Sequence, residues 1–152
     1  MQEEFMREAL RLAEKAKKKG EVPIGAVVVL NGKIIGKGYN LRTRLQLATA
    51  HAEIRAIEKA CKKARSWRLP EAEIYVTLEP CPMCMGAILN ARIDRVYFGA
   101  YEGKGRSLTN ELAEANLLNH KTEVVGGVLE EECKQVLSSF FSEMRLREKT
   151  KK

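Results

Sequence analysis

Residues 73–90 read EIYVTLEPCPMCMGAILN and combine a strand, a turn and the start of a helix in one stretch. The first six residues are mostly β-branched or aromatic, which favours a buried strand. Pro82 suits the first turn of a helix, where its missing N–H costs nothing. Between the two elements stand Cys81 and Cys84, and a Cys-x-x-Cys pair is half of a typical zinc site. The stretch predicts a strand that delivers two metal ligands to the start of a helix.

Hydrophobic periodicity on either side of this stretch predicts the remaining elements. Helices are expected over 2–19, about 50–64, from 82 onward and over 130–147, with one short helical piece inside 101–119. Strands are expected in a hairpin over 24–40 around Asn31-Gly32, with its first strand over 25–30, then over 73–78, 95–100 and within 122–129. This order predicts an α/β fold, a three-layer α/β/α sandwich around a mixed five-stranded sheet. No repeat or linker divides the chain, so residues 1–152 are expected to form a single domain.

The composition of the chain bears on its expected cellular location. Of its 152 residues, 45% are hydrophobic and 31% charged, an ordinary balance for a globular protein. No run approaches the ~18 apolar residues of a membrane span. The N-terminus is charged and helical in period, unlike a secretory signal. We therefore expect a cytoplasmic location, where thiols stay reduced and a Cys-x-x-Cys binds metal or does redox chemistry.

The charge balance suggests a polyanionic partner. The formal net charge is +7, and a small basic protein often binds nucleic acid. Basic residues gather in 55–68 and in a tail that begins at about 145. Both clusters are expected to contact phosphates, although a solvated helix face and a solubilising tail explain them equally well from charge alone.

The Cys-x-x-Cys pair needs further ligands to complete a zinc site. The other cysteines, Cys61 and Cys133, fall on apolar helix stripes, where a free cysteine packs as a small hydrophobe. The chain offers no second Cys-x-x-Cys for a four-cysteine ribbon and no histidine pair for a finger, so only His51 and His120 remain. A site of His51 and the two cysteines has three protein ligands, and its open fourth position is typical of catalytic zinc.

Glu53 follows His51 in HAE and completes the candidate chemistry. At the start of a helix it can lie over the open metal position and move a proton without binding the metal. Each motif alone has an ordinary alternative, a core or surface histidine for HAE and a redox pair for PCPMC. Together, H-x-E followed after 26 residues by P-C-x-x-C matches the known signature of zinc-dependent nucleobase deaminases.

The order of these motifs also carries a family resemblance. The stretches AHAE and TLEPCPMC are specific for the cytidine deaminase superfamily, and EVPIGAVVV and SSFF are typical of its tRNA branch. Over nearly its whole length the chain resembles the bacterial tRNA-specific adenosine deaminases. The resemblance implies a cytidine-deaminase-like fold, one Zn²⁺ per chain on His51, Cys81 and Cys84, and Glu53 as proton shuttle. It further implies conversion of adenosine to inosine at the wobble position of a tRNA anticodon loop, and a homodimer.

The same resemblance implies which residues contact the substrate. The matching residues are Asn40, Val22, Pro23, Ile24, Ala52, Pro80, Glu102 and His120, with Glu21 in the same pocket-wall segment. Plain alternatives remain for three of them: Asn40 as a strand-ending turn residue, EVP as a connection, and His120 as a structural histidine. The loop YEGKGRSLTN (101–110) departs from the family, with Glu102 where Asp is common and about two residues fewer. In the family this loop helps to grip the RNA.

Two other functions stay open at this point. One keeps the zinc chemistry and changes the substrate to a free nucleobase or nucleoside, such as guanine or cytidine. Such a metabolite gives no reason for a net charge of +7. The other is a nucleic-acid-binding module with structural zinc, which predicts four protein ligands and tolerance of Glu53→Ala.

Overall fold

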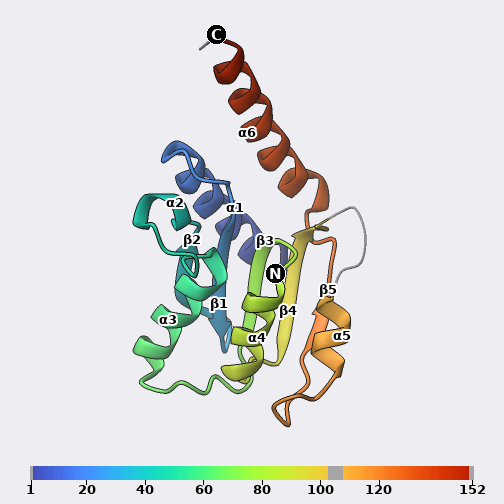
Figure 1. Cartoon of the computed structure of the whole chain (residues 1–152). Helices are drawn as coiled ribbons and strands as arrows, with labels where there is room; N and C mark the ends of the chain where they lie inside the picture. The colour runs from blue at the N-terminus through green and yellow to red at the C-terminus, as the bar shows by residue number, and fades with distance from the viewer. Residues whose placement is uncertain (1, 103–107, 151–152) are drawn as a thin grey trace.

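The computed structural model describes residues 2–102 and 108–150 and has a five-stranded sheet at its centre (Figure 1). The strands are β1 (Gly25–Leu30), β2 (Lys33–Tyr39), β3 (Glu73–Leu78), β4 (Arg95–Ala100) and β5 (Glu123–Val125). The helices of this part of the chain are α1 (Gln2–Lys18), α2 (Arg42–Leu45), α3 (Ala52–Ala64), α4 (Pro82–Asn90), α5 (Thr109–Glu114) and α6 (Glu130–Thr150). No helix among the described residues is long and apolar enough to cross a membrane.

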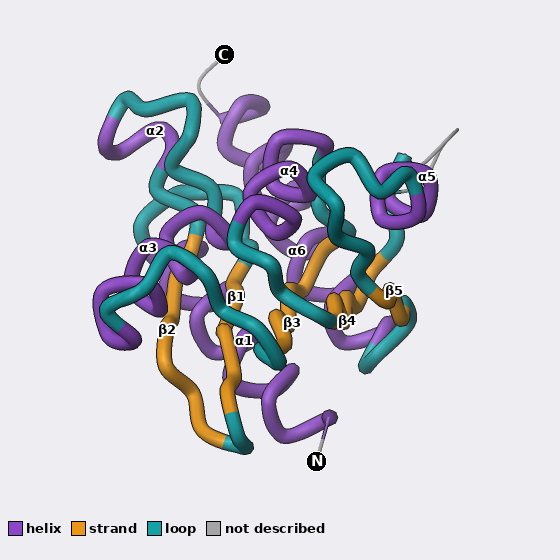
Figure 2. Tube along the Cα trace, turned by 90° about the horizontal axis from the view of Figure 1, so that it is seen from below, coloured by secondary structure: helices purple, strands orange, loops and turns teal. Residues whose placement is uncertain are grey.

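The sheet is mixed, as predicted. Its strand order is β2-β1-β3-β4-β5, which Figure 2 shows from left to right. β1 pairs antiparallel with β2 and β3, whereas β3 with β4 and β4 with β5 are parallel. Asn31 and Gly32 join β1 to β2 with φ of 51° and 74°, the left-handed geometry that a two-residue hairpin turn requires. This confirms the hairpin predicted from Asn-Gly.

Side chains alternate between the two faces of the sheet and so define three layers. On one face, Val27 and Val29 pack with buried residues of α1 and with Cys133 of α6. On the other face, Ala26 and Val28 pack with α3, α4 and α5. β1 is therefore covered on both faces, which explains why its sequence is apolar throughout. The predicted three-layer α/β/α sandwich is confirmed.

Two glycines of β2 let α3 lie directly on the sheet. A Cβ at Gly36 would meet the carbonyl oxygen of Ala56, and a Cβ at Gly38 would meet that of Ala52. The facing side of α3 is correspondingly built from small residues, Ala52, Ala56 and Ala60, which are fully buried. This close approach fixes the N-terminus of α3, which carries His51.

Several boundaries differ from the sequence-based expectation. α2 was not expected, because it is four residues long and buries no side chain. β5 covers only Glu123–Val125, and its pairing with β4 ends at Val125. α6 runs on to Thr150, so the basic residues from 145 lie on a helix instead of a loose tail. Cys133 is buried as predicted, whereas Cys61 lies at the edge of the core. Residues 103–107 of the departing loop lie outside the described residues.

Candidate active site

The site lies where the C-terminal end of β3 meets the N-termini of α3 and α4. His51 is the N-cap residue of α3 and Cys81 that of α4, both with extended backbone (φ −76° and −74°). Pro82 follows at the first position of α4, as predicted. Two helix starts therefore converge, and the positive ends of their dipoles favour thiolates and other anions there.

The three predicted ligands come together at this point. The ligand atoms of His51, Cys81 and Cys84 all lie within 4.8 Å of one another. His51 Nδ1 is 3.7 Å from Cys81 Sγ and 3.5 Å from Cys84 Sγ. Tetrahedral zinc, with bonds of about 2.0–2.1 Å to nitrogen and 2.3 Å to sulfur, separates such atoms by about 3.5 Å. The donor set and its spacing therefore fit a tetrahedral metal ion with one position left open.

The two thiols share a proton in the metal-free arrangement. A hydrogen bond from the Cys84 thiol lowers the pKa of Cys81 to about 5, against the opposing effect of burial. The same interaction, with burial added, raises the pKa of Cys84 far above its ordinary range. One thiolate and one thiol result, so binding of a metal to both sulfurs must displace the remaining proton.

Glu53 is a buried carboxyl group beside the ligand cluster. Its side chain belongs to the first turn of α3, and the residue is only 4% exposed. Burial raises the pKa of Glu53 to about 7, and the negative charge of Cys81 adds to the increase. A carboxyl group with this pKa can take up and release a proton near neutral pH.

A cavity of about 390 Å³ opens over the cluster. It is lined by Ile24, His51, Glu53, Leu78, Glu79, Pro80, Cys81, Pro82, Glu102, Leu108 and Thr109. A smaller hollow of about 110 Å³ adjoins it and is lined by Val22, Ile24, Asn40, Arg42, His51, Ala52 and Glu53. Two carboxyl groups meet at the larger cavity, where the Glu102 backbone N–H donates to Glu79 Oε1 at 3.0 Å. Burial raises the pKa of Glu102, and the neighbouring Glu79 raises it further.

Most of the predicted substrate-side residues therefore line these two hollows. Pro23 is buried and lines neither of them. His120 is not brought to the cluster, because its Nε2 lies 2.8 Å from the carbonyl oxygen of Ile93, beyond the C-terminal end of α4. Cys81 caps the opposite end of that helix. The position of His120 favours its structural alternative.

Sequence reasoning missed several residues at the site. Arg42 enters from α2, and Leu108 and Thr109 enter from the start of α5. The only signal for Arg42 was its place between Asn40 and the HAE motif, and short polar segments give no periodicity to detect. Thr109 donates to the carbonyl oxygen of Pro80 at 3.4 Å, a contact that only the fold reveals.

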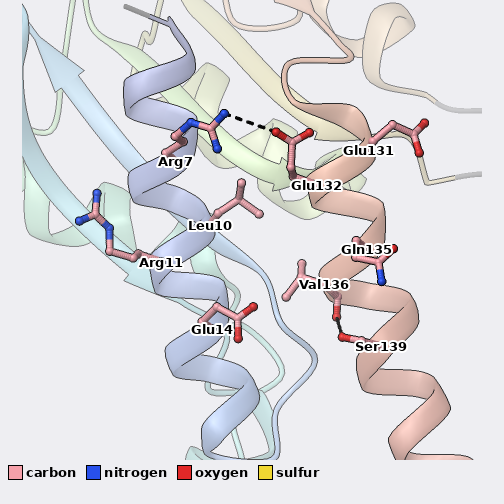
Figure 3. A pocket seen from close by; sticks show the side chains of 9 residues that line it. All are labelled: Arg7, Leu10, Arg11, Glu14, Glu131, Glu132, Gln135, Val136 and Ser139. Carbon is pink, nitrogen blue, oxygen red and sulfur yellow. Dashed lines mark hydrogen bonds and ion pairs between the residues drawn. The ribbon is translucent and has the colours of Figure 1, made fainter.

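A larger hollow lies elsewhere, between α1 and α6 (Figure 3). It measures about 770 Å³, and its walls carry Arg7 and Arg11 from α1 with Glu131 and Glu132 from α6. Arg7 contacts Glu132 at 3.5 Å, and both side chains remain about half exposed, at 55% and 47%. No cluster of metal-ligating atoms was found there among the described residues. Size alone therefore does not make this groove a candidate site.

Comparison with known proteins finds deaminases that match most of the chain. Residues 1–145 match the MafB19-like deaminase family. The chain is 53% identical over 148 residues to a tRNA-specific adenosine deaminase of Bacillus subtilis, covering 95% of this chain and 91% of that protein.

Solved structures agree with this similarity. One, from a study of A-to-I editing by tRNA:A34 deaminases at the wobble position of transfer RNA, is 43% identical with a TM-score of 0.81. It covers 88% of this chain and 99% of the other. A guanine deaminase structure from Bacillus subtilis is 42% identical but covers only 65% of this chain, with a TM-score of 0.62.

Proposed function

Because the chain belongs to the family of MafB19-like deaminases and tRNA-specific adenosine deaminases, we propose that it converts adenosine to inosine at the wobble position of a tRNA anticodon loop. This membership confirms the family predicted from the motifs, and the chain is an enzyme of the deaminase class. The observation that carries the proposal is the cluster of His51, Cys81 and Cys84 with Glu53 buried beside it.

The cofactor we assign is one Zn²⁺ per chain. Its ligands are His51 Nδ1 and the sulfurs of Cys81 and Cys84, whose spacing suits tetrahedral zinc. Zinc held there supplies a nucleophile at neutral pH by lowering the pKa of water. The three-ligand set argues against a structural metal, since structural zinc sites in proteins are nearly always closed by four protein ligands.

Glu53 is the catalytic proton carrier in this proposal. Its carboxylate takes one proton from the attacking water and delivers it to the adenine ring nitrogen next to the attacked carbon. It then takes the proton of the added hydroxyl group and delivers this second proton to the amino group, which leaves as ammonia while the C=O of inosine forms. A pKa near 7 suits both directions of transfer, because neither form of the carboxyl group is strongly favoured. Burial in the cavity wall also keeps bulk water from competing for that proton.

Asn40 lines the smaller hollow, and its side-chain amide already makes two hydrogen bonds within the protein. Its Nδ2 donates to the Val22 carbonyl at 3.2 Å, and its Oδ1 accepts the Arg42 backbone N–H at 3.1 Å. An amide has two N–H groups and two acceptor lone pairs, so one donor and one lone pair remain for a base or ribose edge. We assign this contact to Asn40, with Val22, Ile24, Ala52, Pro80 and Glu102 as cavity walls.

The partner we assign is a tRNA anticodon stem-loop. A target base must leave its stack to enter a cavity of this size, and an unpaired loop lowers the cost of that step. The net charge of +7, with exposed basic residues on α3 and at the end of α6, would attract the phosphates. A single catalytic domain over 1–152, a homodimer and a cytoplasmic location complete the proposal.

A free nucleobase is the second candidate substrate. The resemblance to a guanine deaminase structure favours it, since that protein shares 42% identity over part of this chain. The relative named for tRNA covers more of the chain at higher identity, and it comes from the same species, Bacillus subtilis. We therefore place the tRNA substrate first.

The test uses zinc-loaded protein and a stem-loop carrying adenosine at the wobble position. Inosine is scored by mass, beside free adenosine, cytidine and guanine. The proposal expects inosine in the stem-loop alone, and its loss in Glu53→Ala with zinc retained. Turnover of a free base with an unchanged stem-loop would move the protein to the second candidate. Zinc binding without any turnover would favour a structural metal.

A further inference from the structure

Arg42, one of the residues that line the smaller hollow, belongs to a segment without buried side chains. All residues from 42 to 49 are exposed, and α2 within this segment buries no side chain. The N-cap residue of α2, Leu41, makes no side-chain capping hydrogen bond. Four-residue helices are far too short to be stable by themselves in water. Groups outside the segment must therefore hold it in place.

Glu21 supplies most of that support from about twenty positions upstream. Its carboxylate accepts the backbone N–H of Thr43 on Oε1 at 3.1 Å and that of Arg44 on Oε2 at 2.6 Å. The Asn40 side chain accepts the backbone N–H of Arg42. The first three N–H groups of α2, which a helix cannot satisfy internally, are thus all bound by two side chains. Because Glu21 is only 2% exposed, water does not compete for these bonds.

The held segment carries two arginines, of which Arg42 lies at the site. Residues 40–49 include Arg42 and Arg44 but no acidic residue. Neither arginine forms a side-chain ion pair with any described residue. Arg42 lines the smaller hollow together with His51 and Glu53. An exposed guanidinium at the mouth of a cavity for a flipped nucleotide is well placed to bind the adjacent phosphates.

We propose that Glu21 is a positioning residue for the RNA, and that its buried carboxylate fixes α2 so that Arg42 and Arg44 bind phosphates next to the target nucleotide. This inference rests on the proposed RNA substrate. Pre-organised cations lose little conformational freedom on binding, so a fixed segment strengthens binding without touching the reacting atoms. Glu21 acts through the arginines and is not itself a catalytic residue.

Glu21→Gln is the sharpest change, because it keeps the shape and replaces one acceptor oxygen with a donor that faces an N–H group. We expect the Kd and KM for the stem-loop to rise about tenfold, the effect of one charge-assisted hydrogen bond, while kcat stays within about twofold. The slope of log Kd against log salt should fall by about 0.7 for each phosphate of the single-stranded loop that the arginines no longer neutralise. Amide hydrogen exchange at Thr43 and Arg44 should accelerate.

A double-mutant cycle separates positioning from a general structural role. Arg42→Ala/Arg44→Ala should weaken stem-loop binding at least as much, and adding Glu21→Gln to it should cause no further loss. Arg7→Ala/Arg11→Ala removes the same charge from the groove between α1 and α6 and is the matched control. Zinc content and thermal stability are measured for every variant.

The inference is overturned if Glu21→Gln binds the stem-loop like the wild type, or if its penalty persists undiminished in the Arg42→Ala/Arg44→Ala background. If Glu21→Gln fails to fold, the arginine pair still decides, because a loss no greater than that of the control pair also overturns it. Binding is measured by anisotropy without turnover. A wild type that binds but makes no inosine therefore counts against the proposed reaction and leaves this inference to the binding data.

Discussion

Two of the hollows described above differ in character. The groove between α1 and α6 is the larger, at about 770 Å³ against about 390 Å³ for the cavity over the ligand cluster. The walls of the groove carry exposed ion pairs such as Arg7–Glu132, which contribute little energy. The cavity over the ligand cluster is instead lined by the buried Glu53 carboxyl group and the Cys81 thiol, whose pKa values are strongly shifted. Desolvated reactive groups, and not volume, distinguish the functional hollow.

The largest effect is expected when one of the three candidate metal ligands is replaced. We expect Cys84→Ser to lose tightly bound zinc and all detectable deamination, because the neutral-pH nucleophile depends on the metal. Zinc per chain by atomic absorption and inosine by mass check this. Full activity with zinc still bound would show that the cluster is not the catalytic centre.

Glu53→Gln should leave the metal in place and remove only the proton transfer. A general acid–base group contributes about 10²–10⁴-fold, so kcat should fall by that factor while zinc content stays at the wild-type level. Stem-loop turnover under saturating substrate measures it. A decrease of less than about fivefold would remove Glu53 from the catalytic role.

The protonation of the two thiols predicts how zinc affinity depends on pH. One thiol proton must leave when zinc binds, since the hydrogen bond between the two sulfurs lowers the pKa of Cys81 and raises that of Cys84. Lower pH therefore weakens binding, by about tenfold in Kd per pH unit for one released proton. Competition with a chelator from about pH 8 to about pH 6 tests this sign and slope. A pH-independent Kd would contradict the shared-proton arrangement.

The close packing of α3 on β2 predicts that a side chain at position 38 lowers the stability of the fold. Because His51 is the N-cap residue of α3, the same change should also affect the candidate site. A methyl group at position 38 meets backbone atoms of α3, so Gly38→Ala should cost about 1–3 kcal/mol of unfolding free energy. Urea denaturation measures the loss. Gly32→Ala is a control with open space around its Cβ, where only the left-handed φ of 74° opposes substitution.

The smallest effect is expected in the larger hollow. Arg7→Ala removes one exposed ion pair and should change the unfolding free energy by less than about 1 kcal/mol, with unchanged KM for the stem-loop. A clear rise in KM would mean that the groove takes part in substrate binding, and the contrast between the two hollows would fail.

The sequence was most informative where residue type and spacing are both constrained. β1, β3 and β4 were predicted to the residue, because apolar runs bounded by turn signals have few alternatives. The candidate ligands His51, Cys81 and Cys84 were predicted by elimination, since few side chains can bind zinc, and the structure brings their ligand atoms together. Interactions between segments that are distant along the chain leave no such local pattern in the sequence. The bonds from Glu21 to α2 and the position of His120 beside Ile93 depend on tertiary packing that no local period encodes.

The distal half of α6 is exposed on all sides and is expected to unwind from its end. Cys133, Val136 and Phe140 are the buried residues of this helix, whereas every residue from 141 to 150 is exposed, and Figure 1 shows this part extending away from the sheet. The anchored turns act as a ready-made nucleus, so the remaining turns need only propagate from it. Propagation is nearly balanced in free energy, and unwinding should therefore advance inward from Thr150 in small steps. The contact of Lys17 with Glu143, at 3.4 Å, marks where this end fraying should stop.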